Sequence, residues 1–211
     1  MKVAVINGSP KSNGNTSIAL NAVCGVLEEN GIATHRVEIG SRALHGCTGC
    51  GTCARKQNRR CIFDDDGLNE QLDGIFEADG LLVGSPVYYA GMNGALKAML
   101  DRVFWIATAS GALFRHKVGA GIVVARRGGE ITAWDQLNKY FTISEMFLPS
   151  SGYWNMVFGA TPGEAEQDEE GLHTMRTLGA NMAWLLHGID IAKKSRPLPE
   201  KTQKPRTNFI R

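Results

Sequence analysis

Two kinds of hydrophobic pattern alternate along the chain. Short segments rich in apolar or β-branched residues, most of them apolar at nearly every position, predict strands at residues 3–6, 34–39, 80–83, 118–124 and 155–158. Longer segments with apolar residues every three or four positions predict helices, at residues 16–29, 68–78, 94–106, 131–144 and 171–186. Strands that are apolar throughout are typical of a parallel sheet buried on both faces. The pattern therefore predicts an open, doubly wound α/β domain with a five-stranded parallel sheet and helices on both faces.

The composition agrees with a single soluble domain and argues against several other classes of protein. The 211 residues are 43% hydrophobic and 21% charged, and the formal net charge is +2. A charge this close to balance gives no reason to expect a nucleic acid or a membrane surface as partner. No apolar run approaches the roughly 20 residues that span a bilayer, and the first ten residues contain no apolar signal segment. We therefore expect a cytoplasmic protein.

The sequence predicts one domain over residues 1–190, followed by a tail over residues 191–211. From residue 193 the chain is basic, contains proline and lacks any helical or strand-like period. Two interpretations of the tail remain open: a solvated extension, or an arm that lies on a neighbouring subunit.

The segment after the first predicted strand, residues 7–17 (NGSPKSNGNTS), is rich in small polar residues. In open α/β sheets ligands bind beyond the carboxyl ends of the strands, where helix N-termini present free N–H groups. The spacing is neither that of a P-loop nor that of the G-x-G-x-x-G fingerprint. We expect a phosphate monoester that is held rather than cleaved, and the alternative is a polar loop that only caps a helix. The expected phosphate contacts are Ser9, Lys11, Gly14, Asn15, Thr16 and Ser17.

A second polar turn follows the third predicted strand, in residues 84–102 (GSPVYYAGMNGALKAMLDR). Two tyrosines stand at the strand end beside glycines, and core packing is the alternative account of them. With the first loop, this segment resembles the flavodoxin-like NAD(P)H-dependent FMN reductase family, whose pattern there is (S/T)PVYxxxMxxxLKxxxDR. The resemblance covers about residues 1–190, and the pattern matches at Pro86, Val87, Tyr88, Met92, Leu96, Lys97, Asp101 and Arg102.

The resemblance implies a flavodoxin-like three-layer sandwich that binds FMN, with the phosphate in the first loop. The flavin ring would contact the second turn and the segment 125–130 (ARRGGE), through Pro86, Val87, Tyr88, Tyr89, Gly91, Arg126, Gly128 and Gly129. The flavin itself would take a hydride from NAD(P)H and pass electrons to a quinone-like or other small acceptor, without a catalytic side chain. An exposed ring usually gains shelter from a second subunit, so we expect a homodimer or homotetramer. Residues 147–155 (FLPSSGYWN) are the candidate interface.

Four of the five cysteines follow the spacing C-x2-C-x2-C-x7-C, at Cys47, Cys50, Cys53 and Cys61. This compact spacing favours an iron–sulfur cluster. Zinc is the second interpretation, because zinc sites more often have two C-x2-C pairs that are far apart. The segment also resembles the iron–sulfur flavoprotein branch of the same family, which implies a 4Fe–4S cluster on these four residues. Relatives with similar loops bind flavin alone, so a site without a cluster stays an alternative.

Three functions therefore remain open. The first is an FMN-dependent oxidoreductase that uses NAD(P)H. The second is an iron–sulfur flavoprotein that carries electrons between a ferredoxin-like protein and an acceptor. The third is a flavin- or metal-binding redox module without turnover. Cys24, inside the first predicted helix, is expected to be a small buried hydrophobic residue.

Overall fold

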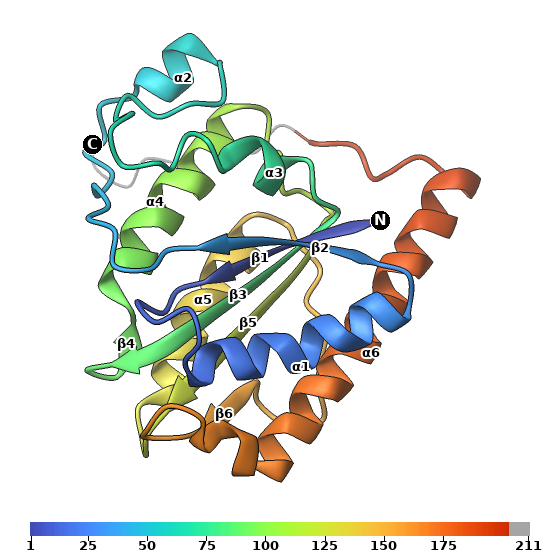
Figure 1. The fold of residues 1–211 in the computed structure, drawn as a ribbon. Helices are drawn as coiled ribbons and strands as arrows, with labels where there is room; N and C mark the ends of the chain where they lie inside the picture. Colours follow the sequence, from blue (N-terminus) through green and yellow to red (C-terminus); the bar gives the residue numbers. More distant parts are fainter. Residues whose placement is uncertain (203–211) are drawn as a thin grey trace, which may run out of the picture.

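The computed structural model describes residues 1–202 and contains a twisted sheet between two layers of helices (Figure 1). Five parallel strands lie in the order β2-β1-β3-β5-β6, and a short sixth strand, β4, pairs antiparallel with β3. The predicted five-stranded parallel sheet is confirmed, and β4 adds to it. The strands are β1 (Lys2–Asn7), β2 (Ala33–Glu38), β3 (Gly80–Tyr88), β4 (Gly91–Met92), β5 (Val118–Ala125) and β6 (Met156–Phe158).

Helices cover both faces of the sheet. On one face lie α1 (Asn15–Glu29) and α6 (Glu169–Ser195), which pack against each other. On the other face lie α3 (Leu72–Phe76), α4 (Gly94–Ala109) and α5 (Glu130–Ile143). A five-residue helix, α2 (Thr52–Lys56), contacts α4, and a 3-10 turn, η1 (Glu164–Gln167), precedes α6. Within residues 1–202, no helix combines the length and the apolar character that crossing a membrane requires.

Neighbouring residues of a central strand enter different hydrophobic cores. In β1, Ile6 faces the core under α3, α4 and α5, while Val5 faces the core under α1 and α6. In β3, Leu81 and Leu82 divide between the cores in the same way. Both cores exclude water, since these four side chains are at most 1% exposed. This explains why the central strands are apolar at every position and not at every second one.

The predicted helix at 68–78 is wrong in its length, because only Leu72–Phe76 is helical. The backbone at Gly67 is left-handed, with a φ of 75°. The side chain of Asn69 bonds the main chain at Cys61 and Phe63. Side-chain bonds of this kind compete with helical hydrogen bonds, so residues 69–71 form a turn and not part of the helix.

The last helix is longer than predicted. α6 begins at the N-cap Asp168 and runs to Ser195, so the first residues of the predicted tail, 191–195, are helical. Beyond the helix, the guanidinium of Arg115 donates a hydrogen bond of 3.1 Å to the carbonyl oxygen of Glu200. The rest of the predicted arm, residues 203–211, lies outside the described residues.

The strand order brings together three loops that are far apart in sequence. The chain passes from β1 outward to β2 and then returns to β3 on the other side of β1. This reversal leaves a crevice beyond the carboxyl ends of β1 and β3, which is where ligands of open α/β sheets bind. The loops after β1, β3 and β5 meet at this edge, because these strands are neighbours.

Candidate functional site

A cavity of about 220 Å³ opens at the carboxyl edge of the sheet, between the loops after β1, β3, β5 and β6. Most of the residues that we expected to contact a flavin line this one cavity. Two cationic side chains contribute to the wall, and no carboxylate does among the described residues. The lining residues are Ser9, Pro10, Lys11, Gly14, Asn15, Thr16, Pro86, Val87, Tyr88, Val124, Arg126, Gly159, Ala160 and Pro162.

The loop after β1 is held in shape by its own hydrogen bonds. The amide of Ser9 donates to Asn7 Oδ1 over 3.1 Å, and the amide of Lys11 donates to Ser9 Oγ over 3.1 Å. Ser9 and Thr16 are buried at the base of the cavity, while Lys11 is exposed at its mouth. The loop therefore presents hydroxyl groups from below and a positive charge from outside.

Asn15 lines the cavity, as we expected of a phosphate contact, and its side chain also makes hydrogen bonds to another loop. Its side-chain nitrogen donates to the carbonyl oxygen of Thr161 over 2.9 Å, and its side-chain oxygen accepts the amide of Gly163 over 3.0 Å. The side chain thus ties the loop after β1 to the loop after β6. Ser17 does not reach the cavity, and its amide bonds the carbonyl oxygen of Gly14 over 2.9 Å.

The tyrosine turn is a two-residue hairpin between β3 and β4. Tyr88 lines the cavity, but Tyr89 is fully exposed and contributes nothing to it. Tyr89 and Ala90 both have positive φ, at 49° and 57°. A pair of positive φ values defines a type I′ turn, which usually has asparagine or glycine at these positions. In this conformation the Tyr89 side chain points into solvent and does not line the cavity, so its expected ring contact stays a prediction.

The loop after β5 supports this turn instead of lining the cavity through its glycines. A Cβ atom on Gly129 would lie 2.8 Å from Ala90 Cα, so only glycine permits the close packing of the two loops. From α5, Gln136 accepts the amide of Met92 over 3.1 Å. Gly91 packs beside Gln136, and Gly91, Gly128 and Gly129 do not line the cavity. Of the expected flavin contacts in the loop after β5, only Arg126 lines the cavity.

The sequence-based reasoning missed the loop after β6. Gly159, Ala160 and Pro162 line the cavity, together with Pro10 and Val124. A signal was available, because this loop follows a parallel strand and must lie at the same edge as the other three. Gly159 is also required sterically, since a Cβ atom there would lie 2.7 Å from Asn15 Nδ2.

All four cysteines of the spaced motif line a second cavity, at the other end of α4. Cys53 is buried, Cys61 is partly buried, and Cys47 and Cys50 are exposed. Hydrogen bonds from the hydroxyl and the amide of Thr52 lower the pKa of the Cys50 thiol. The five cysteines are free thiols, and within residues 1–202 no three His, Cys, Asp or Glu side chains are arranged to hold a metal ion. The chain thus gathers the four thiols on one wall without bringing them to a common centre.

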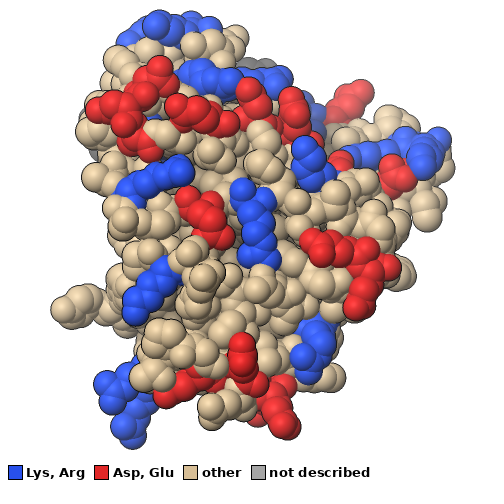
Figure 2. Space-filling model, viewed as in Figure 1, with Lys and Arg blue, Asp and Glu red and all other residues tan. Residues whose placement is uncertain are grey.

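Basic side chains surround this segment. Arg55 and Lys56 end α2, and the guanidinium of Arg55 donates to the carbonyl oxygen of Cys50 over 2.9 Å. Arg60 pairs with Asp73 at 2.6 Å. In Figure 2 lysine and arginine side chains lie along the upper edge of the molecule, and aspartate and glutamate side chains lie directly below them. A group of thiolates, which is negative, would lie in a favourable field here.

A buried ion pair between Arg102 and Asp66 closes the cysteine segment. Both side chains are almost fully buried, and the carboxylate also accepts the amides of His45 and Leu68. Burial alone would raise the pKa of Asp66, but the hydrogen bonds from Arg102 and these amides outweigh it and lower that pKa. Asp66 accepts the amide of Leu68, yet its main partner comes from α4.

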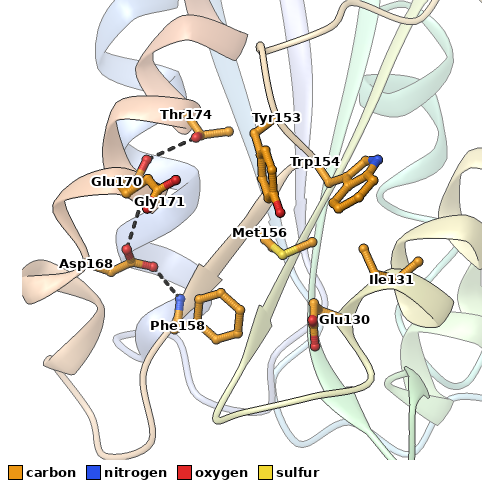
Figure 3. Close-up of a pocket in the computed structure, with 10 residues that line it drawn as sticks. All are labelled: Glu130, Ile131, Tyr153, Trp154, Met156, Phe158, Asp168, Glu170, Gly171 and Thr174. Carbon is orange, nitrogen blue, oxygen red and sulfur yellow. Dashed lines mark hydrogen bonds between the residues drawn. The ribbon is translucent and has the colours of Figure 1, made fainter.

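A third cavity lies beside β6, between α5 and α6 (Figure 3). Figure 3 shows Tyr153, Trp154 and Phe158 around it, and each of these aromatic side chains is 38% exposed or more. The carboxylate of Asp168 accepts the amide of Phe158 over 2.7 Å, so this amide of the edge strand β6 has a hydrogen-bond partner. Of the residues that the structure describes, three carboxylates and no cation line this cavity, which makes it unsuited to an anionic ligand. It includes part of the segment 147–155, the candidate interface.

Comparison with known proteins agrees with these features. The family model for NADPH-dependent FMN reductases matches residues 1–161. An iron–sulfur flavoprotein of Methanocaldococcus jannaschii is 35% identical over 190 residues, which are 87% of this chain and 96% of that protein. An iron–sulfur flavoprotein of Methanosarcina thermophila is 32% identical over 178 residues, covering 83% of this chain and 90% of that protein.

Solved structures share the fold at low sequence identity. The crystal structure of RosB with the bound intermediate 8-demethyl-8-formylriboflavin-5′-phosphate has a TM-score of 0.70 and 16% identity, over 100% of this chain and 92% of that one. A WrbA-like flavodoxin from Agrobacterium tumefaciens has a TM-score of 0.62 and 18% identity, over 89% and 97%. The three-layer flavodoxin-like fold is therefore confirmed. The chain belongs to the NADPH-dependent FMN reductase family of flavin oxidoreductases, and within it to the iron–sulfur flavoproteins.

Proposed function

We propose that the protein is an oxidoreductase that binds FMN in the cavity at the carboxyl edge of the sheet and takes its electrons from NAD(P)H. The observation that carries this proposal is the lining of that cavity, which within residues 1–202 joins hydroxyl groups, glycines and two cations and includes no carboxylate. An anionic phosphate suits such a wall. The cavity of Figure 3, with its three carboxylates, does not suit it.

The phosphate end would lie against the start of α1. Gly14 is the N-cap of this helix, and no side chain caps it. The first amides of an uncapped helix and the helix dipole both favour an anion. Thr16 and Ser9 would add hydroxyl donors, and Lys11 would add charge. Asn15 would act indirectly, by fixing the loop after β6 against this end of the cavity.

The ring end would lie against Pro86, Val87 and Tyr88 at the end of β3. A volume of about 220 Å³ is smaller than the 300–1,000 Å³ of typical enclosed ligand sites. This supports a flavin whose phosphate is enclosed while its ring stays open on one face. Arg126 on the opposite wall would attract negative charge on the ring.

When bound, FMN would supply a ring that accepts a hydride from NAD(P)H and returns two electrons to a quinone-like or other small acceptor. The residues of the chain bind and orient the reactants. The cavity leaves an open side at Tyr88, where a planar donor or acceptor could approach. Because donor and acceptor would use the same side in turn, we expect ping-pong kinetics.

A second candidate function, electron transfer as an iron–sulfur flavoprotein with a ferredoxin-like partner, is favoured by the cysteine cavity. Four thiols on one wall, close to basic side chains, fit a 4Fe–4S cluster in donor type and number. Cys47, Cys50, Cys53 and Cys61 would hold it, and it would supply one-electron transfer. Thiolate ligands of this kind persist in a reducing compartment, which supports a cytoplasmic location.

We also propose that two or four copies assemble through the segment 147–155. Phe147, Leu148, Tyr153 and Trp154 are between 38% and 58% exposed, so their apolar surfaces lie open to water in the single chain. Contiguous exposed apolar surface of this kind is typical of protein interfaces.

The experiment that tests both functions starts from protein purified without oxygen. Flavin bands in the absorbance spectrum, FMN on extraction and oxidation of NADH or NADPH with a quinone acceptor are expected for the first function. About four irons per chain, a broad brown absorbance lost in Cys47→Ser, and flavin reduction by a ferredoxin are expected for the second. Bound flavin with neither activity would leave the non-catalytic redox module.

A further inference from the structure

The guanidinium of Arg102 is a buried charged group that the proposed reaction does not use. It projects from α4, is 1% exposed and lines the cysteine cavity. Its Nε–H donates to Cys61 Sγ over 3.2 Å. We propose that Arg102 is a positioning residue for an iron–sulfur cluster, which holds the Cys61 sulfur by a hydrogen bond and raises the reduction potential of the cluster. This inference rests on the proposed cluster.

Every N–H group of Arg102 has a partner. Beside Cys61 Sγ, the guanidinium bonds the carbonyl oxygen of His45 over 3.3 Å and that of Phe63 over 3.1 Å. The two remaining groups bond both carboxylate oxygens of Asp66. An arginine has five such donors in a fixed plane. Their full use fixes the direction of Nε–H toward the sulfur, which a lysine could not reproduce.

The partners of Arg102 stand at both ends of the cysteine segment. His45 precedes Cys47, while Phe63 and Asp66 follow Cys61. The rings of His45 and Phe63 stack with centroids 4.4 Å apart, and Arg102 lies over the Phe63 ring at 5.7 Å. The two ends of the segment are therefore joined to each other and to α4. This leaves Cys61 in a defined position before any cluster binds.

The hydrogen bond from Arg102 would affect the reduction potential of the cluster through charge. One-electron reduction would add a negative charge to the cluster and its thiolates. A hydrogen bond to a ligand sulfur stabilises the more negative state and raises the potential. Asp66 balances most of the charge of Arg102, so removing either partner should shift the potential, and in opposite directions.

The test measures the reduction potential of the cluster in anaerobic holoprotein by dithionite titration, with iron content determined in parallel. Arg102→Lys should lower the ratio of reduced to oxidised cluster at a fixed solution potential about tenfold, which corresponds to 59 mV for one electron. Asp66→Asn leaves the charge of Arg102 unbalanced and should raise that ratio. Arg115→Lys is the matched control, because Arg115 is also an arginine paired with a carboxylate, that of Glu145, but does not line the cysteine cavity. It should leave the ratio unchanged.

A second measurement uses wild-type protein, so it does not depend on whether a variant folds. Wild-type protein labelled with [15N]arginine should show a 15N coupling to the reduced cluster in electron spin-echo spectra, and Arg115→Lys should keep it. A missing coupling, or shifts of the same sign in Arg102→Lys and Asp66→Asn, would overturn the role of Arg102. A wild-type protein without iron would instead overturn the cluster, and this inference with it.

Discussion

Tyr89 and Ala90 occupy backbone conformations that cost non-glycine residues about 1 kcal/mol or more each. The rest of the turn is fixed by Gln136 and by the glycine at 129, so the strain is kept by neighbouring loops. Strain of this kind concentrates at functional sites. The tyrosine pair was found from its position at a strand end, but which of the two faces the cavity depends on the turn type.

Tyr89→Gly should therefore raise the free energy of unfolding, by about 1 kcal/mol, because glycine adopts positive φ without strain. Urea denaturation measures this. The affinity of the cavity for the FMN phosphate should change little, since Tyr89 does not line the cavity. Tyr88→Gly is the matched control, and it should weaken FMN binding and lower stability. A Tyr89→Gly protein that is less stable than wild type would show that the turn is not strained.

Cys24 provides a pH-dependent prediction. Burial in α1 raises the pKa of its thiol from an ordinary 9.0 to about 11. Between these values the folded protein keeps a proton that the unfolded chain has lost. This contribution to stability is complete below pH 9 and disappears as the pH rises through about 11.

The free energy of unfolding should therefore fall between pH 9 and 11, and the fall should be smaller in Cys24→Ala. Tyr140, whose pKa is raised to about 12, contributes equally in both proteins. The two proteins are compared by how steeply the free energy of unfolding falls with pH. Its absolute value is not compared, because the smaller alanine side chain changes that value at every pH. Equal slopes would mean that Cys24 is not buried as described.

At the scale of elements, the period of the hydrophobic residues predicted most helices and strands. It did not predict the short strand β4 or the correct length of α3. β4 has only two residues and follows a tight turn, so it leaves no period to detect. α3 was overestimated because Asn69 and Gly67 redirect the chain by local hydrogen bonding and a positive φ. The loop after β6 could have been expected at this edge because it follows a parallel strand, but its bond to Asn15 could not, since the two residues are more than 140 positions apart in sequence.

Asn15→Ala should separate the loops after β1 and β6. The side chain makes three hydrogen bonds to residues 161–165. Their loss should lower the free energy of unfolding by about 1–3 kcal/mol and weaken FMN binding. Ser17→Ala, in the same helical turn but outside the cavity, should leave FMN affinity unchanged. Titration calorimetry distinguishes the two, and equal effects would refute the bridging role of Asn15.

At the scale of the whole molecule, the order of parallel strands could be expected from the fold class, and it alone brings the predicted flavin residues to one edge. The aromatic segment 147–155 could be identified as a candidate interface from its sequence. The cavity beside it could not be predicted, because it is formed by three elements from separate parts of the chain (Figure 3).

Trp154→Glu should disrupt the assembly, since it puts a charge on the exposed apolar segment. Light scattering after gel filtration should give the mass of two or four chains for wild type and of fewer chains for this variant. Trp184 is 77% exposed on α6, and this helix offers an alternative surface for the assembly. Dissociation by Trp184→Glu and not by Trp154→Glu would move the interface to α6.

The central claim is that the cavity at the carboxyl edge grips the phosphate of FMN, and a titration of flavin-free protein tests it most directly. FMN should bind about 100-fold more tightly than riboflavin, because hydrogen bonds to a charged phosphate contribute roughly 1.5–3 kcal/mol each. Thr16→Ala should reduce this preference at least about tenfold, with the chain still folded. Equal affinities for FMN and riboflavin, or a preference untouched by Thr16→Ala, would contradict the account.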